Sequence, residues 1–245
     1  MSDTSAPAYR RILLKLSGEA LRSPGSMDNI SPEIVARIAE EIAQAHRAGV
    51  QIGLVVGGGN FWRGAKASVR GMDRATADYV GMLATVMNAL ALQSALERAG
   101  VPCVVQSAIE MKNVAESFIR LKARSYLDND KIVIFGAGTG NPYFSTDTTA
   151  ALRAAEIEAD VILMAKKGTD GIYDSDPNKN ANAKKFDSLT YIEILNRGLH
   201  VMDTTATSLC MDNKIPLLVF NIDDHENIFR AALGEEIGTT VGGEE

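Results

Sequence analysis

Residues 31–59 read SPEIVARIAEEIAQAHRAGVQIGLVVGGG, a helical pattern that runs into an apolar segment and ends in three glycines. Ser31-Pro32 suits an N-cap followed by the first helical residue, and Gly49 suits the end of the helix. Apolar side chains would share one helical face at Ile34, Ile38, Ile42 and Ala45. Residues 50–56 are aliphatic without strict alternation, which is typical of a strand covered on both faces. The stretch therefore predicts a helix, a buried strand and a glycine-rich loop.

The same alternation continues along the chain. Further strands are predicted at residues 11–16, 101–105, 131–135, 160–164 and 216–220. Further helices are predicted at residues 73–99, 113–124, 147–158, 204–212 and 225–233. Alternating strands and helices favour an α/β fold, a three-layer α/β/α sandwich with an open, mostly parallel central sheet. Because the chain has no linker or internal repeat, residues 1–245 are expected to form one domain, with a flexible N-terminus at residues 1–8.

Composition narrows the classes of function. The 245 residues carry a formal net charge of −6, which argues against a broad nucleic-acid-binding surface and leaves anionic ligands to local basic clusters. The N-terminal residues 1–9 are polar, and no run of about 18 apolar residues is present, so we expect neither a secretory signal nor a membrane span. The expected location is the cytoplasm.

Ligands of open α/β sheets bind beyond the carboxyl ends of the strands, so the loops after the strands hold the candidate site. The first loop follows Lys15 with Leu16-Ser17-Gly18, where an ammonium and exposed backbone N–H groups suit a phosphate. Taken alone, a strand-end lysine that reaches solvent is the simpler interpretation. The second loop, Gly57 to Gly64, adds three glycines and Arg63, whose guanidinium can bind phosphate oxygens in pairs.

Two later loops have the same character. Residues 136–147 combine glycines, hydroxyls and Asp147 directly before a predicted helix, whose N-terminus favours a phosphate. Asp147 could also simply cap that helix. Residues 166–177 carry two lysines, an Asp-Gly turn, Tyr173 and acidic residues, although a solvated turn has the same composition.

Two common nucleotide-binding motifs are missing. No Gly-Lys pair occurs, so there is no GxxxxGK[ST] loop, and Asn141 prevents residues 136–141 from matching GxGxxG. A P-loop kinase and a Rossmann dehydrogenase are both disfavoured. The sequence predicts four phosphate-binding loops that converge on one edge of the sheet.

Those loops resemble bacterial uridylate kinases, within the amino acid kinase superfamily. The matching segments are residues 15–19, 57–64, 82–88, 138–147 and 170–177, and the likeness runs in order from about residue 9 to 241. The resemblance implies phosphoryl transfer from ATP to UMP, with Mg²⁺ as the cofactor held mainly by ATP rather than by a metal site on the protein. It also implies a homohexamer, with GTP as activator and UTP as inhibitor in many members.

The resemblance implies two sets of binding residues. The ATP set is Lys15, Leu16, Ser17, Gly18, Gly59, Arg63, Lys167, Tyr173 and Asp176. The UMP set is Gly58, Asp78, Thr139, Gly140, Asn141, Pro142, Tyr143, Phe144, Ser145 and Thr146. The catalytic residues would be Lys15, Arg63 and Asp147. The loop after Lys166 is one residue longer than in some members, so its ATP ligand is open, and we assign Lys167.

Two other functions stay open at this level. A kinase of the same superfamily could act on a carboxylate or carbamate, although such an acceptor would call for cations placed against it. A nucleotide-binding regulator or storage protein of this fold would bind ATP without phosphorylating UMP.

Overall fold

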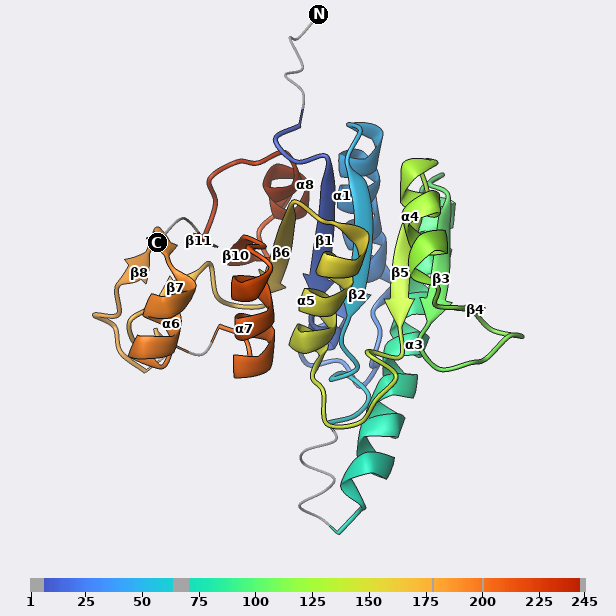
Figure 1. The fold of residues 1–245 in the computed structure, drawn as a ribbon, viewed down its shortest axis with the longest axis horizontal. Coiled ribbons are helices and arrows are strands. Elements are labelled where there is room, and N and C mark those ends of the chain that lie inside the picture. Colours follow the sequence, from blue (N-terminus) through green and yellow to red (C-terminus); the bar gives the residue numbers. More distant parts are fainter. Residues whose placement is uncertain (1–6, 64–70, 178, 200, 243–245) are drawn as a thin grey trace, which may run out of the picture.

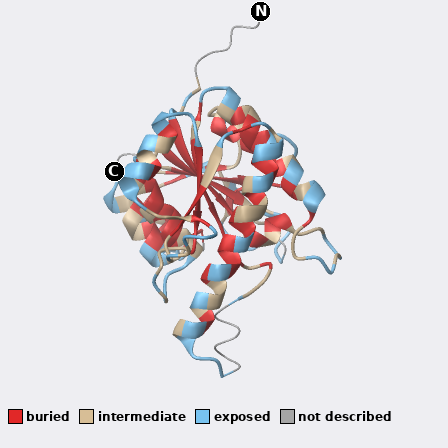
Figure 2. Ribbon diagram, turned by 90° about the vertical axis from the view of Figure 1, so that its right-hand side faces the viewer, coloured by how far each residue is buried: buried red, intermediate tan, exposed pale blue. Residues whose placement is uncertain are grey.

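The computed structural model describes residues 7–63, 71–177, 179–199 and 201–242, and in it a nine-stranded sheet lies between two layers of helices (Figure 1). The central strands of the sheet are buried in the middle of the molecule (Figure 2). The expected three-layer α/β/α fold is confirmed. The expected flexible N-terminus falls largely on residues 1–6, which lie outside the described residues.

The sheet has the order β4-β3-β5-β2-β1-β6-β10-β11-β9. Its strands are β1 Arg11–Leu16, β2 Gln51–Val56, β3 Cys103–Ser107, β4 Glu116–Ser117, β5 Ile132–Gly136, β6 Val161–Lys166, β9 Ser188–Leu189, β10 Leu217–Asn221 and β11 Thr239–Val241. Neighbours pair in parallel except β10 with β11. A separate antiparallel pair joins β7 Ile172–Tyr173 to β8 Lys185–Phe186. The mostly parallel sheet was predicted correctly.

Each face of the sheet has its own helices. One face carries α1 Pro32–Arg47, α3 Arg74–Arg98 and α8 Asn227–Ala232. The other carries α4 Arg120–Asp128, α5 Thr146–Ile157, α6 Tyr191–Arg197 and α7 Thr204–Asp212. Strand β1 serves both cores, because Leu14 packs into the first and Leu13 into the second. This double burial explains why the strand sequences do not alternate.

The predicted helix at residues 113–124 is wrong in its first half. Glu116 and Ser117 instead form β4 beside β3, and the helix begins only at Arg120. Phe118 packs edge-on against Phe135 at 5.8 Å between ring centroids, and Tyr126 donates a hydrogen bond to Glu116. These tertiary contacts favour an extended chain over the local helical pattern. The elements α6, β7, β8, β9 and β11 were not predicted.

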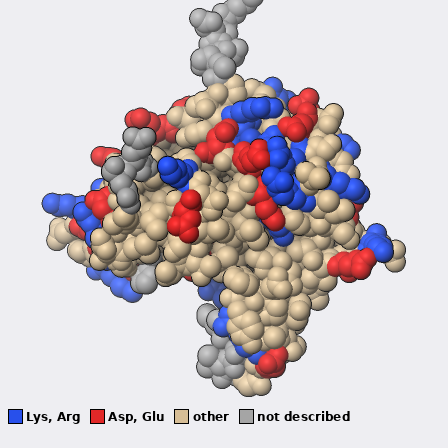
Figure 3. Space-filling model, viewed as in Figure 1, with Lys and Arg blue, Asp and Glu red and all other residues tan. Residues whose placement is uncertain are grey.

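Helix α3 is long and apolar enough to cross a membrane, with a mean hydropathy of 1.4 over an 18-residue window. Half of that window is buried inside the protein, and α3 packs against α1, β3 and β5. A core helix of a globular fold has these same properties. On the face shown in Figure 3, basic and acidic side chains are interspersed rather than gathered by sign.

Candidate active site

The loops after β1, β2, β5 and β6 meet at one edge of the sheet. These strands lie side by side in the order β5-β2-β1-β6, and all four run in parallel. Their carboxyl ends therefore bring together loops that are far apart in the sequence. The predicted convergence is what the fold produces.

Lys15 and Asp147 form an ion pair at this edge. Lys15 lies near the end of β1 and is 9% exposed, and its Nζ is 2.7 Å from Asp147 Oδ1. Asp147 lies in the first turn of α5, whose N-cap is Ser145, so the carboxylate is also favoured by the helix dipole. The alternative that Asp147 caps the helix is wrong, because Ser145 is the cap and Asp147 pairs with the ammonium of Lys15.

The glycines of the first two loops are needed for close packing between the loops. A Cβ atom on Gly18 would lie 2.5 Å from the Gly57 carbonyl oxygen and 2.5 Å from Asn60 Oδ1. A Cβ atom on Gly58 would lie 2.7 Å from the Gly81 carbonyl oxygen in α3. A side chain at Gly18 would force the first two loops apart, and one at Gly58 would force the glycine loop away from α3, so the observed packing requires glycine at both positions.

Arg63 and Lys167 both bind the segment that follows β1. Arg63 is half exposed, and its Nη2 lies 2.7 Å from Glu19 Oε1. Lys167 Nζ donates to the carbonyl oxygens of Glu19, at 3.2 Å, and Arg22, at 2.9 Å. Both cations thus surround the β1 loop. Gly64, at the end of the predicted glycine loop, lies outside the described residues.

A cavity of about 330 Å³, here called the α3 cavity, opens between the glycine loop, α3 and residues 138–149. It is lined by Gly58, Gly59, Trp62, Arg74, Asp78, Gly81, Met82, Thr85, Gly138, Thr139, Asn141, Tyr143, Phe144, Ser145, Thr146 and Thr149. Eight of the ten residues predicted for UMP line it, and Gly140 and Pro142 do not. Asp78 accepts hydrogen bonds from Arg74 and from the Tyr143 backbone, each at 2.8 Å.

The loop after β5 is held in an unusual backbone conformation. Ala137, Gly138 and Tyr143 all have positive φ, of 60°, 60° and 74°. Thr85 accepts a hydrogen bond from the Ala137 N–H at 2.8 Å, and buried Arg153 donates to the Gly138 carbonyl at 3.2 Å. Two helices, α3 and α5, therefore fix the loop from opposite sides.

A second cavity of about 470 Å³, here called the β7 cavity, lies beyond β6. It is lined by Lys166, Thr169, Gly171, Ile172, Tyr173, Asp174, Ser175, Asp176, Pro177, Arg197, Gly198, Leu199, Val201 and Val219. Tyr173 donates a 2.6 Å hydrogen bond to Asp170, which raises the pKa of Tyr173 and lowers the pKa of Asp170. The predicted residues Tyr173 and Asp176 both line this cavity.

Lys166 connects the β7 cavity to the ion pair. Its Nζ donates to the Val201 carbonyl at 2.9 Å. Burial lowers the pKa of Lys166, the charge of Lys15 lowers it further, and Asp147 opposes both effects. Thr146, which lines the α3 cavity, precedes Asp147, and Lys166, which lines the β7 cavity, lies close enough to Lys15 and Asp147 to be affected by both charges, so residues of the two cavities flank the ion pair.

The sequence pattern of the Amino acid kinase family matches residues 10–221. The chain belongs to the amino acid kinase family.

Two relatives in this family are uridylate kinases of Limosilactobacillus reuteri, 58% and 57% identical over 236 residues. In each case the match covers 96% of this chain and 98% of the relative. The resemblance to bacterial uridylate kinases inferred from the loop motifs is confirmed by these relatives.

Solved structures of UMP kinases are similar to this protein over nearly the whole chain. The UMP kinase of Bacillus anthracis superposes with a TM-score of 0.93 at 39% identity, over 97% of each chain. The UMP kinase of Ureaplasma parvum superposes with a TM-score of 0.91 at 40% identity, over 96% of this chain and 99% of that one. At these identities the likeness extends beyond the fold alone.

Sequence reasoning missed several side chains of this amino acid kinase site. Thr85 and Arg153 hold the loop after β5, but each stands within an ordinary helical pattern that carries no signal of that contact. Lys166 lines the β7 cavity, whereas Lys167, which we had assigned, does not line it and binds the β1 loop instead. Lys166 donates a hydrogen bond to the carbonyl of Val201, 35 residues away, and this contact cannot be predicted from the spacing of residues in the sequence.

Proposed function

We propose that the protein transfers the γ-phosphoryl group of Mg-ATP directly to UMP, giving ADP and UDP, in pyrimidine nucleotide biosynthesis. The observation that carries the proposal is the Lys15–Asp147 ion pair between two cavities of nucleotide size. The uridylate kinase relatives and UMP kinase structures support an enzyme that is a UMP kinase.

The α3 cavity is the proposed UMP site. Its carboxylate, Asp78, suits the ribose hydroxyls, and the N-terminus of α5 at Ser145 and Thr146 suits the acceptor phosphate. The segment Thr139 to Phe144 would surround the uracil. Gly58, which leaves no room for a side chain against Gly81 of α3, would bring its backbone close to the acceptor.

The ATP site is proposed to extend from the β1 loop to the β7 cavity. The adenosine would lie against Tyr173 and Asp176, and the phosphates against residues 15–18, Gly59 and Arg63. Lys167 would act through the β1 loop that it binds, and Lys166, which lines the β7 cavity, would lie near the adenosine.

Mg²⁺ fits this site as a partner of ATP. Among the described residues no group of three or more His, Cys, Asp or Glu side chains could hold a metal ion, so the phosphates would supply most ligands. Asp147 is the carboxylate beside Lys15 that could face it. When bound, Mg²⁺ neutralises charge on the ATP phosphates.

The protein's part in the transfer is alignment and charge neutralisation. A phosphate oxygen of UMP would form a bond to the γ-phosphorus while the bond from that phosphorus to the β–γ bridging oxygen breaks, and ADP would keep the electron pair. Lys15 and Arg63 would donate hydrogen bonds to the oxygens of the migrating group. Asp147 would hold Lys15 in place through the 2.7 Å ion pair.

We further propose that the whole chain works as one domain in the cytoplasm, assembled as a homohexamer, with GTP as activator and UTP as inhibitor. The resemblance to bacterial uridylate kinases supports these features. Sedimentation analysis, and initial rates with GTP or UTP added, would test them.

The test of the function is an initial-rate assay with Mg-ATP and UMP, CMP or dUMP as acceptor. We expect strong UDP formation from UMP and little product from CMP. Tight binding of ATP without a diphosphate product from any acceptor would contradict the proposal and favour a nucleotide-binding regulator.

A further inference from the structure

Two buried asparagines pair with each other beneath the glycine loop. Asn88 lies on α3 and is 0% exposed, and Asn60 follows the glycine triplet and is 6% exposed. Each side-chain amide donates to the other, at 2.7 Å and 2.9 Å. Buried polar groups of this kind are costly unless every donor is used.

All four N–H donors of this amide pair have partners. Besides the two reciprocal bonds, Asn88 Nδ2 donates to the Gly57 carbonyl at 2.7 Å. Asn60 Nδ2 donates to the Asn29 carbonyl, in the segment before α1, at 2.8 Å. The orientation of both amides is therefore fully determined.

The amide pair lies directly against the β1 loop. The two atoms nearest to a Cβ on Gly18 would be the Gly57 carbonyl oxygen and Asn60 Oδ1. One of these atoms accepts a bond from Asn88, and the other belongs to the pair itself. The pair thus sets how closely the β1 loop and the glycine loop approach each other.

We propose that Asn88 is a positioning residue for phosphoryl transfer, which acts through Gly57 to fix the spacing between the ATP and UMP loops, while its partner Asn60 has a structural role. The inference rests on the proposed function, which places ATP phosphates on the β1 loop and UMP beside Gly58. Neither asparagine lines the α3 cavity or the β7 cavity, so neither is a ligand contact there.

The test compares two matched variants, Asn88→Asp and Asn60→Asp. Each replaces one amide of the pair by a carboxylate, and each removes one reciprocal bond and one bond to a backbone carbonyl. The difference is which carbonyl is released, Gly57 in the first variant and Asn29 in the second. If Asn88 had only a structural role, the two variants should lose kcat equally. If Asn88 is a positioning residue, Asn88→Asp should lose more kcat than Asn60→Asp.

We expect similar losses of Tm in both variants but a much lower kcat in Asn88→Asp, by about a hundredfold, because a small misplacement of reacting groups has effects of that size. The KM for each nucleotide should change little, since the lining of both cavities is intact. Equal losses of kcat in the two variants, or an unchanged kcat in Asn88→Asp, would overturn the proposal.

Two further measurements keep the result interpretable. If either Asp variant does not fold, Asn88→Ala and Asn60→Ala repeat the comparison without a buried charge, with the same expected ranking of kcat. Gln106→Met removes a fully buried amide whose two polar atoms have no hydrogen-bond partner among the residues that the structure describes, and its kcat should match the wild type. If the wild type itself makes no UDP, the proposed function fails, and the spacing is then judged by whether Asn88→Asp, and not Asn60→Asp, weakens the binding of a bisubstrate analogue that joins ATP to UMP; unchanged binding in Asn88→Asp would overturn the spacing role.

Discussion

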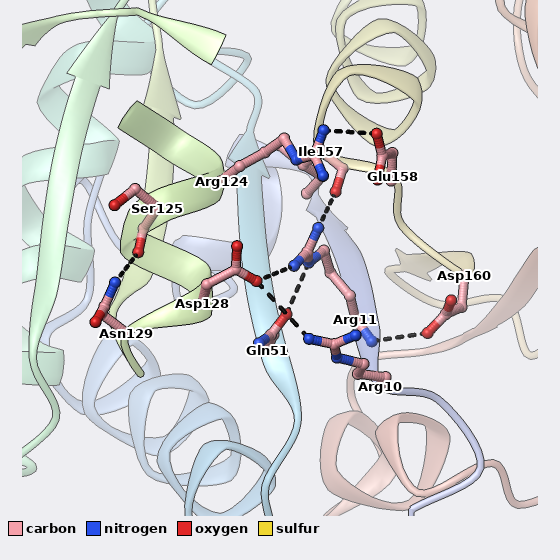
Figure 4. Close-up of polar contacts among 10 residues, drawn as sticks. All are labelled: Arg10, Arg11, Gln51, Arg124, Ser125, Asp128, Asn129, Ile157, Glu158 and Asp160. Carbon is pink, nitrogen blue, oxygen red and sulfur yellow. Dashed lines mark hydrogen bonds and ion pairs between the residues drawn. The ribbon is translucent and has the colours of Figure 1, made fainter. Parts of the chain in front are cut away.

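Strand β1 carries a buried cation at each end, and the two are held in different ways. At the amino end, the guanidinium of Arg11 lies among Gln51, Ile157 and Asp128 and donates to all three (Figure 4). The Arg11 backbone N–H also donates to Asp160. Arg11 is 6% exposed, so its charge is almost fully enclosed by partners.

At the carboxyl end, the ammonium of Lys15 is almost as buried but has a single ion-pair partner, Asp147, among the described residues. An ammonium has three donors, so most of its hydrogen-bonding capacity is left for an incoming anion. A buried cation held by three hydrogen-bonding partners contributes to the fold, whereas one with a single partner, at a strand's carboxyl end, suits a phosphate.

The largest expected effect is that of Lys15→Met on turnover. We expect kcat to fall about a hundredfold to a thousandfold, because a preorganised charge beside the migrating group is lost. The free energy of unfolding should change little, since Asp147 keeps the favourable N-terminus of α5. Initial rates of UDP formation and urea unfolding check both parts.

The next largest effect is expected from Arg11→Met, and it falls on stability rather than on turnover. Arg11→Met keeps the aliphatic stem but leaves the Ile157 carbonyl without its donor and Asp128 with only the longer ion pair to Arg10, so we expect a loss of roughly 2 to 3 kcal/mol in the free energy of unfolding. At a temperature where the variant is folded, kcat should equal that of the wild type. A lowered kcat in folded Arg11→Met would break the comparison between the two ends.

A smaller effect is expected from a larger residue in the loop that follows the carboxyl end of β1. In Gly18→Ala the new methyl group would press on Gly57 and Asn60, costing about 1 to 3 kcal/mol and lowering kcat as well. The control is Gly49→Ala, where nothing lies within 4 Å of the added carbon but φ is +95°. There we expect a stability loss of roughly 1 to 2 kcal/mol from backbone strain, with kcat unchanged.

The smallest effect is a pH dependence that involves Lys166. Its pKa is lowered from 10.5 in the folded state, mainly by burial, so the unfolded chain binds this proton more tightly. Stability should therefore rise with pH between the lowered pKa and 10.5, and the rise should be absent in Lys166→Met. Tm measured across the alkaline range gives the sign, and an identical slope in the variant would rule out Lys166 as its source.

Much of the fold could be predicted because its signals are local. The helix start at Ser31-Pro32 and the apolar strands are properties of short segments, and they place the four loops correctly. The helix predicted from residue 113 failed because Glu116 pairs with Gln106 of β3 and Phe118 packs against Phe135 of β5, contacts that the local pattern does not contain. The single-domain organisation stays a prediction.

The site was only partly within reach of the sequence. Glycine-rich loops and the cation at Lys15 are visible as motifs, but the choice between Lys166 and Lys167 depends on which faces the β7 cavity. The contacts of Asn88 with the Gly57 carbonyl and of Arg153 with the Gly138 carbonyl also cannot be predicted from the sequence. In each case the side chain belongs to a helix, and the carbonyl belongs to a loop elsewhere in the chain. Their roles follow from three-dimensional packing alone.

The most direct test measures kcat for UDP formation and the free energy of unfolding on Lys15→Met and Arg11→Met side by side. The account predicts opposite outcomes, with catalysis lost and stability kept in the first, and stability lost and catalysis kept in the second. Comparable losses of both quantities in both variants would contradict the assignment of the carboxyl end of β1 as the site of phosphoryl transfer.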